Sequence, residues 1–407
     1  MSAQIPSVDS FRERVLKTFD AFLPSTGDWE RDGHLPRELF AAFGAAGIFR
    51  ERWAAGAGGG LALGRALVEE IAPLSGGAAL ALSIHCEVFI QALTRFGGAR
   101  HAALLGAAVD GTAVGCVALT EPGGGSDVYS MTTRAVPVDP GPDGAGRAWR
   151  LVGEKRFTTN SGRASHVLTL ARTGAQDGAF TLFVVPLDRS GASVTGFYET
   201  LGMHAADTGG VVFDVAVTEA DVVGRVDAGL MYVLKLLDYE RVAAAAGVTA
   251  AARAALALAT AHLRERTQFG RRLFDHQALA HRLADRWAET EAAAALLDAA
   301  CRDARGEQLP HHLVAAAKLF AVRAGVAAID EAIQFLGARG YTEHYPLARM
   351  YRDARLARIG GGTDEMLRQI IAMHLDVPDP AASASLARFA AESAARAGAA
   401  SAGQPVT

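Results

Sequence analysis

The sequence has few cysteines and lacks the motifs that bind metals. Cys86, Cys116 and Cys301 lie far apart, and no pair has CxxC spacing, so neither a disulfide framework nor a zinc site is indicated. The histidines form no HExxH pair, and His311 and His312 are adjacent, which does not place two ligands on one helix face. The sequence therefore predicts no metal centre and reduced thiols.

An excess of one charge and a long uninterrupted apolar run are also absent. The net charge is -4, with acidic and basic residues interspersed, which argues against a nucleic-acid partner. The most apolar early stretch, 78–90, contains a histidine and a glutamate and is shorter than the ~20 residues that cross a bilayer, so no membrane span is predicted. The polar first residues do not resemble a secretory signal, and we expect a cytoplasmic protein.

The chain is long enough to bury a large core. It has 407 residues, 50% of them hydrophobic, and this length allows two or three domains. Apolar residues recur at spacings of three and four over most of 1–112, which predicts an N-terminal helical domain. From 113 to 222 short β-type runs alternate with Gly, Asp and Pro clusters, which predicts a central β domain. Within it, 138–147 is rich in turn residues and is expected to be an exposed hairpin or loop.

Long helical patterns return over 223–377 and suit a helix bundle. The longest begins near Leu230 and is predicted to end near Gln268. Further helices are predicted over 276–305, 311–336 and 363–374. Beyond them, 378–407 has few large apolar residues and is predicted to be a disordered tail outside the fold.

The first segment that indicates chemistry is LTEPGGGSD, residues 119–127. Its glycines permit close approach of a ligand to the backbone, and Ser126 and Asp127 offer side-chain oxygens, so a nucleotide or a flavin could lie against it. The same composition is also typical of a plain connecting loop. A second segment, VGEKRFTTNSGR at 152–163, reads by itself as a strand with a packed aromatic residue.

Together these segments resemble the acyl-CoA dehydrogenase family, whose signatures TEPGGGSD and G-x-K-x-[WF]-[IT]-T-N they match in order and spacing. The resemblance covers about residues 10 to 375. It implies an α+β fold with an N-terminal helical domain, a central β-barrel and a C-terminal four-helix bundle, assembled as a homodimer or homotetramer, with FAD as cofactor. The residues that it places against the flavin are Leu119, Thr120, Ser126, Phe157 and Thr159.

Two further segments are assigned to the cofactor through the resemblance. RTQFGRRLFDHQ, from Arg266, reads by itself as a basic helix terminus. In the family such a segment reaches the FAD diphosphate of a partner subunit, a task that suits the planar fork of arginine. QFLGARG resembles the family's Q-x-x-G-G-x-G turn, with Ala338 in place of the second glycine. The residues implied are Arg266, Gln268, Phe269, Gln334 and Gly337.

The last segment, YRDARLARIGGGTDE, ends in a predicted helix start, with Thr363 as N-cap and Glu365 in the first turn. The resemblance places both beside the flavin. Many family members carry their catalytic glutamate in this loop, as I-Y-E-G-T, but this chain has Gly361 there. Either the chemistry has been lost or the base comes from another segment.

The isovaleryl-CoA and long-chain dehydrogenases of the family also lack this loop glutamate and supply it from a helical D-x-E-R segment. This chain has Asp238, Tyr239, Glu240 and Arg241. Considered alone, Glu240 would be an ordinary solvated carboxylate. The resemblance instead makes it the catalytic base, in an apolar neighbourhood that would raise its pKa, and it assigns Arg241 to substrate binding.

The implied reaction is removal of the α-proton of an acyl thioester by Glu240 and transfer of the β-hydride to flavin N5, giving a trans-2-enoyl thioester. The Gly361 N–H would hydrogen-bond the thioester carbonyl, and Ser126 would also border the substrate. The implied partners are acyl-CoA or an acyl carrier protein as substrate, and an electron-transfer flavoprotein as acceptor. Three alternatives stay open: carrier-bound acyl groups, a flavin-dependent monooxygenase or oxidase, and a scaffold without turnover.

Overall fold

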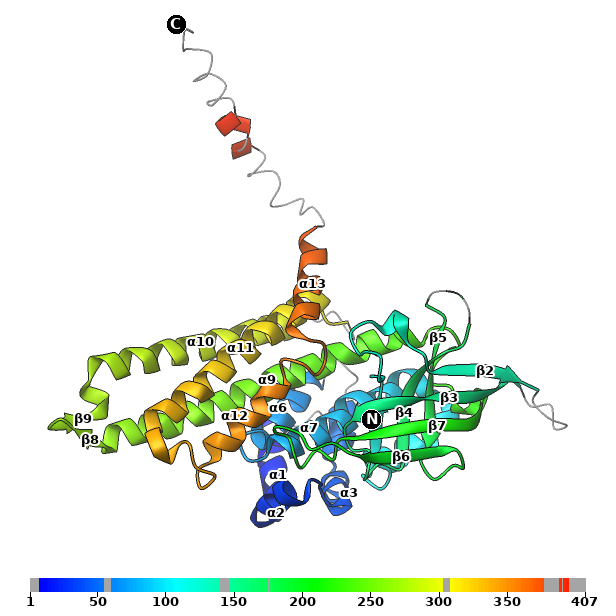
Figure 1. Ribbon diagram of the computed structural model, residues 1–407, viewed down its shortest axis with the longest axis horizontal. Helices are drawn as coiled ribbons and strands as arrows, with labels where there is room; N and C mark the ends of the chain where they lie inside the picture. Colours follow the sequence, from blue (N-terminus) through cyan, green and yellow to red (C-terminus); the bar gives the residue numbers. More distant parts are fainter. Residues whose placement is uncertain are drawn as a thin grey trace, which may run out of the picture.

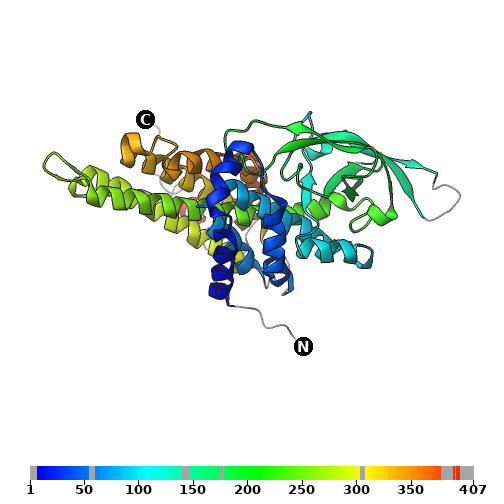
Figure 2. The same ribbon diagram turned by 90° about the horizontal axis from the view of Figure 1, so that it is seen from below.

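The computed structural model describes residues 7–54, 60–139, 146–174, 176, 178–302, 308–376, 388–389 and 391–394. A curled β-sheet lies at one end of the molecule, and long helices extend to the other end (Figure 1). The N-terminal helices pack against both (Figure 2). The predicted order of a helical, a β and a second helical part is confirmed, whereas the predicted tail, 378–407, lies almost wholly outside the described residues.

The N-terminal part is helical, and serines cap the starts of two of its helices. Ser7 accepts a hydrogen bond from the Ser10 N–H at the start of α1, and Ser75 accepts one from the Ala78 N–H at the start of α7. The described helices are α1 (Val8–Asp20), α2 (Thr26–Asp32), α3 (Arg37–Ala45), α4 (Ile48–Ala54), α6 (Leu61–Ile71), α7 (Gly76–Ser83) and α8 (Ala102–Val109). After α7 the chain continues in two π-helical segments, η2 (Ile84–Ile90) and η3 (Leu93–Gly97).

The central part is a single seven-stranded sheet in the order β1-β4-β2-β3-β7-β6, with β5 paired to β4. Its strands are β1 (Gly115–Ala118), β2 (Arg134–Val138), β3 (Ala148–Thr158), β4 (His166–Arg172), β5 (Phe180–Pro186), β6 (Ala192–Phe197) and β7 (Gly209–Thr218). The predicted β-barrel thus takes the form of a curled sheet. Val138 pairs antiparallel with Ala148, and the exposed hairpin or loop predicted over 138–147 falls mostly on 140–145, which lie outside the described residues.

The C-terminal part consists of α9 (Gly229–Glu265), α10 (Gln277–Arg302), α11 (His311–Leu336), α12 (Pro346–Leu356) and α13 (Asp364–Leu375). The prediction that the longest helix ends near Gln268 is wrong. It ends at Glu265, and the chain then forms a hairpin of β8 (Thr267–Gln268) and β9 (Arg271–Arg272). Phe269 and Gly270 both have positive φ, as the two central residues of a type I′ turn require.

Within the described part of the chain, three helical stretches are long and apolar enough to cross a membrane by length and composition: Gly76–Gly97, Gly229–Glu265 and His311–Arg339. More than half of the most apolar window of each is buried within the protein. Their apolar side chains, among them Phe89, Leu236 and Ile329, belong to the core. Packing of these helices within the fold therefore accounts for their composition.

A buried ion pair joins the two segments that carry the strongest sequence signatures. Lys155 of β3 lies with its Nζ 2.9 Å from Glu121 Oε1 and donates a second hydrogen bond to the Leu119 carbonyl, at 3.2 Å. Glu121 also accepts hydrogen bonds from Thr132 and Thr133. Desolvation by itself would raise the pKa of Glu121, but these hydrogen bonds and the positive charge of Lys155 outweigh it and lower the pKa to about 2. The pair holds the loop after β1 against β3.

We expect Lys155→Met to lower the free energy of unfolding by about 3–5 kcal/mol, because it leaves the buried Glu121 charge without its cation. The double variant Lys155→Met/Glu121→Gln should recover much of this loss, since it buries no charge. The measurement is denaturant unfolding followed by circular dichroism. Arg150→Met is the control, because it breaks an exposed ion pair with Asp214 on the same sheet, and it should cost far less than Lys155→Met. Equal losses in Lys155→Met and Arg150→Met would contradict the prediction.

Candidate functional site

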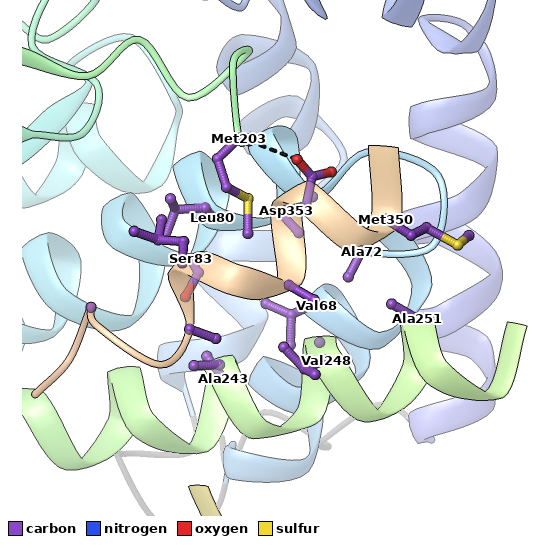
Figure 3. Close-up of a pocket in the computed structure, with 18 of the residues that line it drawn as sticks. Val68, Ala72, Leu80, Ser83, Met203, Ala243, Val248, Ala251, Met350 and Asp353 are labelled. Carbon is purple, nitrogen blue, oxygen red and sulfur yellow. Dashed lines mark hydrogen bonds between the residues drawn. The ribbon is translucent and has the colours of Figure 1, made fainter. Parts of the chain in front are cut away.

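An apolar cavity runs along one face of α9 and contains the predicted base. Its lining from α9 consists of Glu240, Ala243, Ala244, Gly247, Val248 and Ala251, the three- and four-residue spacing of a single helix face. Figure 3 shows Ala243, Val248 and Ala251 in succession along this helix, with Val68 of α6 beside Val248, and with Ala72 and Met350 near the end at Ala251. The cavity is therefore long and walled mainly by small side chains.

Glu240 is a carboxylate whose pKa is raised by its surroundings. Burial is the main cause, and the positive charges of Lys318 and Arg241 partly oppose it. The side chain lines the cavity, so a ligand there would meet it. A carboxylate with a raised pKa is a stronger base towards a carbon acid.

The three-glycine turn, Gly360 to Gly362, lies directly beside Glu240. Gly361 and Gly362 have φ of +64° and +98°, a conformation that glycine adopts with least strain. A Cβ atom on Gly361 would lie 3.5 Å from Glu240 Oε1. A carboxylate on residue 361 and one on residue 240 would thus occupy the same region of the cavity, which gives a physical reason why a glutamate on the helix can accompany a glycine in the turn.

Lys318 of α11, which no sequence motif indicated, is fully buried against this turn. It donates hydrogen bonds to the carbonyls of Gly360 and of Gly362, the latter at 2.8 Å. Burial lowers the pKa of Lys318 to about 8, although the negative charge of Glu240 opposes this shift. The sequence feature that could have indicated Lys318 is its position as the single lysine in the apolar run LVAAAKLFAV. A lysine is almost never fully buried without a partner, so a buried lysine there indicates a specific contact.

Arg241 holds the same turn from the other side. Its Nε donates to the Gly361 carbonyl at 2.9 Å, and its Nη1 donates to Asp238 at 3.0 Å. Asp238 also pairs with His311, and this hydrogen bond raises the pKa of His311. The guanidinium of Arg241 is therefore engaged within the protein and positions the turn, and its contact with a substrate stays a prediction.

The two segments assigned to the flavin lie side by side. The Arg156 N–H donates to the Thr120 carbonyl at 2.8 Å, which brings Leu119 and Thr120 next to Phe157 and Thr159. Phe157 lies where the pairing of β3 with β7 shifts register. Its φ is +55°, and its ring is 59% exposed, 4.6 Å from that of Tyr198.

A strained and exposed aromatic residue persists only where its surroundings enforce it. The open backbone at Gly124, where a Cβ atom would meet nothing within 4 Å, and the exposed Ser126 lie on the loop after β1. A flat aromatic ring and an open glycine loop are groups that suit a flat cofactor. These residues thus fit FAD as the sequence predicts.

The other predicted cofactor residues lie far from this face. Glu240 and Glu265 are 25 residues apart on α9, about 37 Å at 1.5 Å per residue, and the β8–β9 hairpin follows Glu265 at the end remote from the sheet (Figure 1). Phe269 at its tip is 93% exposed. The residues at this end are Arg266, Gln268, Phe269, Gln334 and Gly337. Within one protomer they do not reach the residues grouped around Phe157, so a shared cofactor site requires a second copy.

Thr363 and Glu365 lie at the start of α13, directly after the glycine turn. Thr363 Oγ1 accepts a hydrogen bond from the Met366 N–H at 3.3 Å, which confirms the predicted N-cap, and Glu365 is exposed in the first turn. The structure thus brings Glu240, Arg241, Gly361 and Thr363 together with Lys318.

Comparison with known proteins agrees with this geometry. The chain matches the acyl-CoA dehydrogenase N-terminal domain over 6–104, the middle domain over 116–216 and the C-terminal domain over 227–375. It is 33% identical to the acyl-[acyl-carrier-protein] dehydrogenase MbtN of Mycolicibacterium paratuberculosis, over 91% of this chain and 95% of that protein. It is 30% identical to the mitochondrial isovaleryl-CoA dehydrogenase of Oryza sativa subsp. japonica, over 91% and 89%.

Among solved structures, butyryl-CoA dehydrogenase from Megasphaera elsdenii superimposes with a TM-score of 0.83 at 28% identity, over 93% of this chain and 100% of that one. The order of a helical, a β and a second helical part therefore has a known counterpart. The chain belongs to the acyl-CoA dehydrogenase family. It is an enzyme of this oxidoreductase family, as predicted.

We expect Gly361→Ala to lower the free energy of unfolding by about 1–2 kcal/mol, because an alanine at φ of +64° is strained. Gly360→Ala is the matched control, since a Cβ atom there would meet its nearest neighbour at 3.9 Å and φ of Gly360 is not positive. Its effect should stay within about 0.5 kcal/mol. Denaturant unfolding compares the two variants, and an equal loss in both would show that the turn does not depend on the backbone conformation of Gly361.

Proposed function

We propose that this protein catalyses the α,β-dehydrogenation of an acyl thioester, with FAD as cofactor and Glu240 as the base that removes the α-proton. The observation that carries this proposal is the placement of the Glu240 carboxylate in an apolar cavity, beside the glycine turn. An apolar cavity suits an acyl chain, and a carboxylate of raised pKa suits proton removal from carbon.

Each residue of the site would have a separate role in the reaction. Glu240 receives the α-proton, and negative charge then develops on the thioester oxygen. The Gly361 N–H is the backbone donor for this oxygen. Bound FAD would supply the acceptor for the β-hydride. The residues that would hold it are Leu119, Thr120, Ser126, Phe157, Thr159, Thr363 and Glu365, with Arg266, Gln268, Phe269, Gln334 and Gly337 contributed by a second copy.

Two features of the proposal concern partners. The far placement of the β8–β9 hairpin supports a homodimer or a homotetramer, and an electron-transfer flavoprotein is the acceptor that we propose for the reduced cofactor. The substrate carrier is either CoA or an acyl carrier protein. The similarity to the carrier-protein dehydrogenase MbtN is as extensive as that to isovaleryl-CoA dehydrogenase, so both carriers are supported.

We also infer an extended acyl chain as substrate. The α9 lining runs from Glu240 to Ala251, 11 residues or about 16 Å of helix. An extended hydrocarbon advances about 1.3 Å per carbon, since its bonds are ~1.5 Å long. An acyl chain that followed this whole face would have about a dozen carbons, and beyond Glu240 the face is formed by glycine, alanine and valine.

We expect Glu240→Gln to lower the rate of anaerobic flavin reduction by an acyl thioester by about 10²–10⁴-fold, because the base is lost. The double variant Glu240→Gly/Gly361→Glu should recover part of the activity, since residue 361 faces the same region as Glu240. Full recovery is not expected, because a glutamate at positive φ is strained. Bleaching of the flavin absorbance measures both rates.

The outcomes of this experiment separate the candidate functions. Wild-type reduction by an acyl-CoA and by the same acyl group on a carrier protein identifies the carrier. Bound flavin that neither thioester reduces would exclude the dehydrogenase proposal. Reduced flavin that is rapidly reoxidised by air would favour an oxidase or monooxygenase.

We expect Gly247→Leu and Ala251→Leu to shorten the longest acyl chain that is oxidised, and to different extents. The two positions are four residues apart, about 6 Å along α9, so their cut-offs should differ by about five carbons. A Cβ atom on Gly247 would lie 3.4 Å from that of Ala72, so the substitution fits the backbone. The measurement is kcat/KM for unbranched acyl-CoAs from butyryl to palmitoyl.

Ala257→Leu adds a leucine to an exposed position of the same helix and should leave the cut-off unchanged. Activity with butyryl-CoA shows that each variant remains folded. If both cavity variants oxidise palmitoyl-CoA as the wild type does, the acyl chain does not lie along α9.

A further inference from the structure

Lys318 is a buried cation beside the proposed site, and the proposed proton transfer gives it no role. It lies on α11, whereas the base lies on α9 and the glycine turn precedes α13. A fully buried lysine is costly unless strong partners surround it. Its hydrogen-bond partners are the carbonyls of Gly360 and Gly362.

These contacts determine the direction in which the Gly361 N–H points, because the peptide bonds of the turn are planar. In a trans peptide the carbonyl of one residue and the N–H of the next point in opposite directions. Because Lys318 holds the Gly360 carbonyl, the Gly361 N–H must point away from Lys318. Arg241 holds the Gly361 carbonyl at 2.9 Å and so fixes the next peptide plane. Successive peptide planes of the turn are thereby set by cations from two helices.

The glycines themselves would not hold this arrangement. Three consecutive glycines lose more conformational freedom on folding than other residues, so external contacts must select one conformation. Lys318 and Arg241 provide these contacts. The Glu240 carboxylate and Lys318 Nζ both lie 3.5 Å from the point where a Cβ atom of Gly361 would be, so the base and the cation flank the same peptide.

We propose that Lys318 is a positioning residue of the dehydrogenase, which aims the Gly361 N–H at the thioester carbonyl and supplies a positive charge facing Glu240. The inference rests on the proposed function. The charged groups that face Lys318 are Glu240 and Arg241 of α9 and Asp364 of α13, and Asp364 is itself paired with Arg358. Glu240 is thus the neighbouring carboxylate whose proton affinity the loss of Lys318 would change most.

The decisive variant is Lys318→Met, which keeps an unbranched side chain and removes the charge and the donors. We expect the rate constant for flavin reduction, per bound flavin, to fall at least tenfold, with KM changed less than threefold, because an interaction made in the transition state is lost. The lower limb of the pH–rate profile should move to higher pH, since Lys318 lowers the pKa of Glu240.

Lys318→Arg separates the two roles. It keeps the positive charge, so the pH–rate profile should keep its position. Its larger guanidinium presents its donors in a rigid planar fork, which does not match the two carbonyls held by the compact ammonium of Lys318, so the rate should still fall. Arg323→Met removes an exposed cation from the same helix and should change neither the rate nor the profile.

Hydrogen exchange of the backbone over 358–364, followed by mass spectrometry, tests the positioning without turnover. We expect at least tenfold faster exchange in this segment of Lys318→Met, with α10 unchanged. Unchanged exchange, or an unchanged rate and pH–rate profile, would overturn the inference. Should Lys318→Met not retain flavin, Lys318→Arg decides, because a wild-type rate and wild-type exchange there would equally overturn it. Wild-type flavin that no thioester reduces would instead mean that the proposed dehydrogenase function is wrong.

Discussion

The site depends on the capture of three consecutive backbone carbonyls by two cations. Lys318 holds the carbonyls of Gly360 and Gly362, and Arg241 holds that of Gly361. The turn lies between two long helices and next to Glu240, so these bonds determine both the shape of the cavity end and the surroundings of the base. Without them the glycine turn would have no fixed conformation, and the packing of α9 against α11 would bury a lysine without partners.

A second buried lysine fixes a loop at the sheet, here chiefly through an ion pair. Lys155 and Glu121 are buried and join the loop after β1 to β3, and Phe157, two residues beyond Lys155, adopts its unusual conformation at the adjacent register shift. In both places a buried charged side chain forms hydrogen bonds with backbone groups that lie in, or next to, a glycine-rich segment. Binding geometry is thus held by rigid elements, although the segments that bear it are loops.

Small residues are concentrated on one face of α9, where they line the cavity. The cavity face of α9 is made of alanine, glycine and valine beyond Glu240, whereas the opposite end of that helix leads to the exposed β8–β9 hairpin. One helix therefore connects an enclosed apolar space to an exposed hairpin that begins about 37 Å from the base. This separation is the structural reason for expecting a second copy at the cofactor site.

The sequence by itself determined the features that depend on neighbouring residues. The range of α11, the Thr363 cap and the β runs follow from patterns over a few residues, and the two signature segments identified the family. The end of α9 was misplaced by three residues, because the turn at Phe269 and Gly270 depends on positive φ angles that composition did not reveal.

Only the tertiary structure decided which distant groups meet. Lys318 is 44 residues from Gly362, and Lys155 is 34 residues from Glu121, and no local pattern encodes either contact. The cavity likewise arises where α9, α7 and α12 come together. The physical reason is that burial of charge and enclosure of space depend on packing between elements, whereas helix caps and strand periodicity depend on residues a few positions apart.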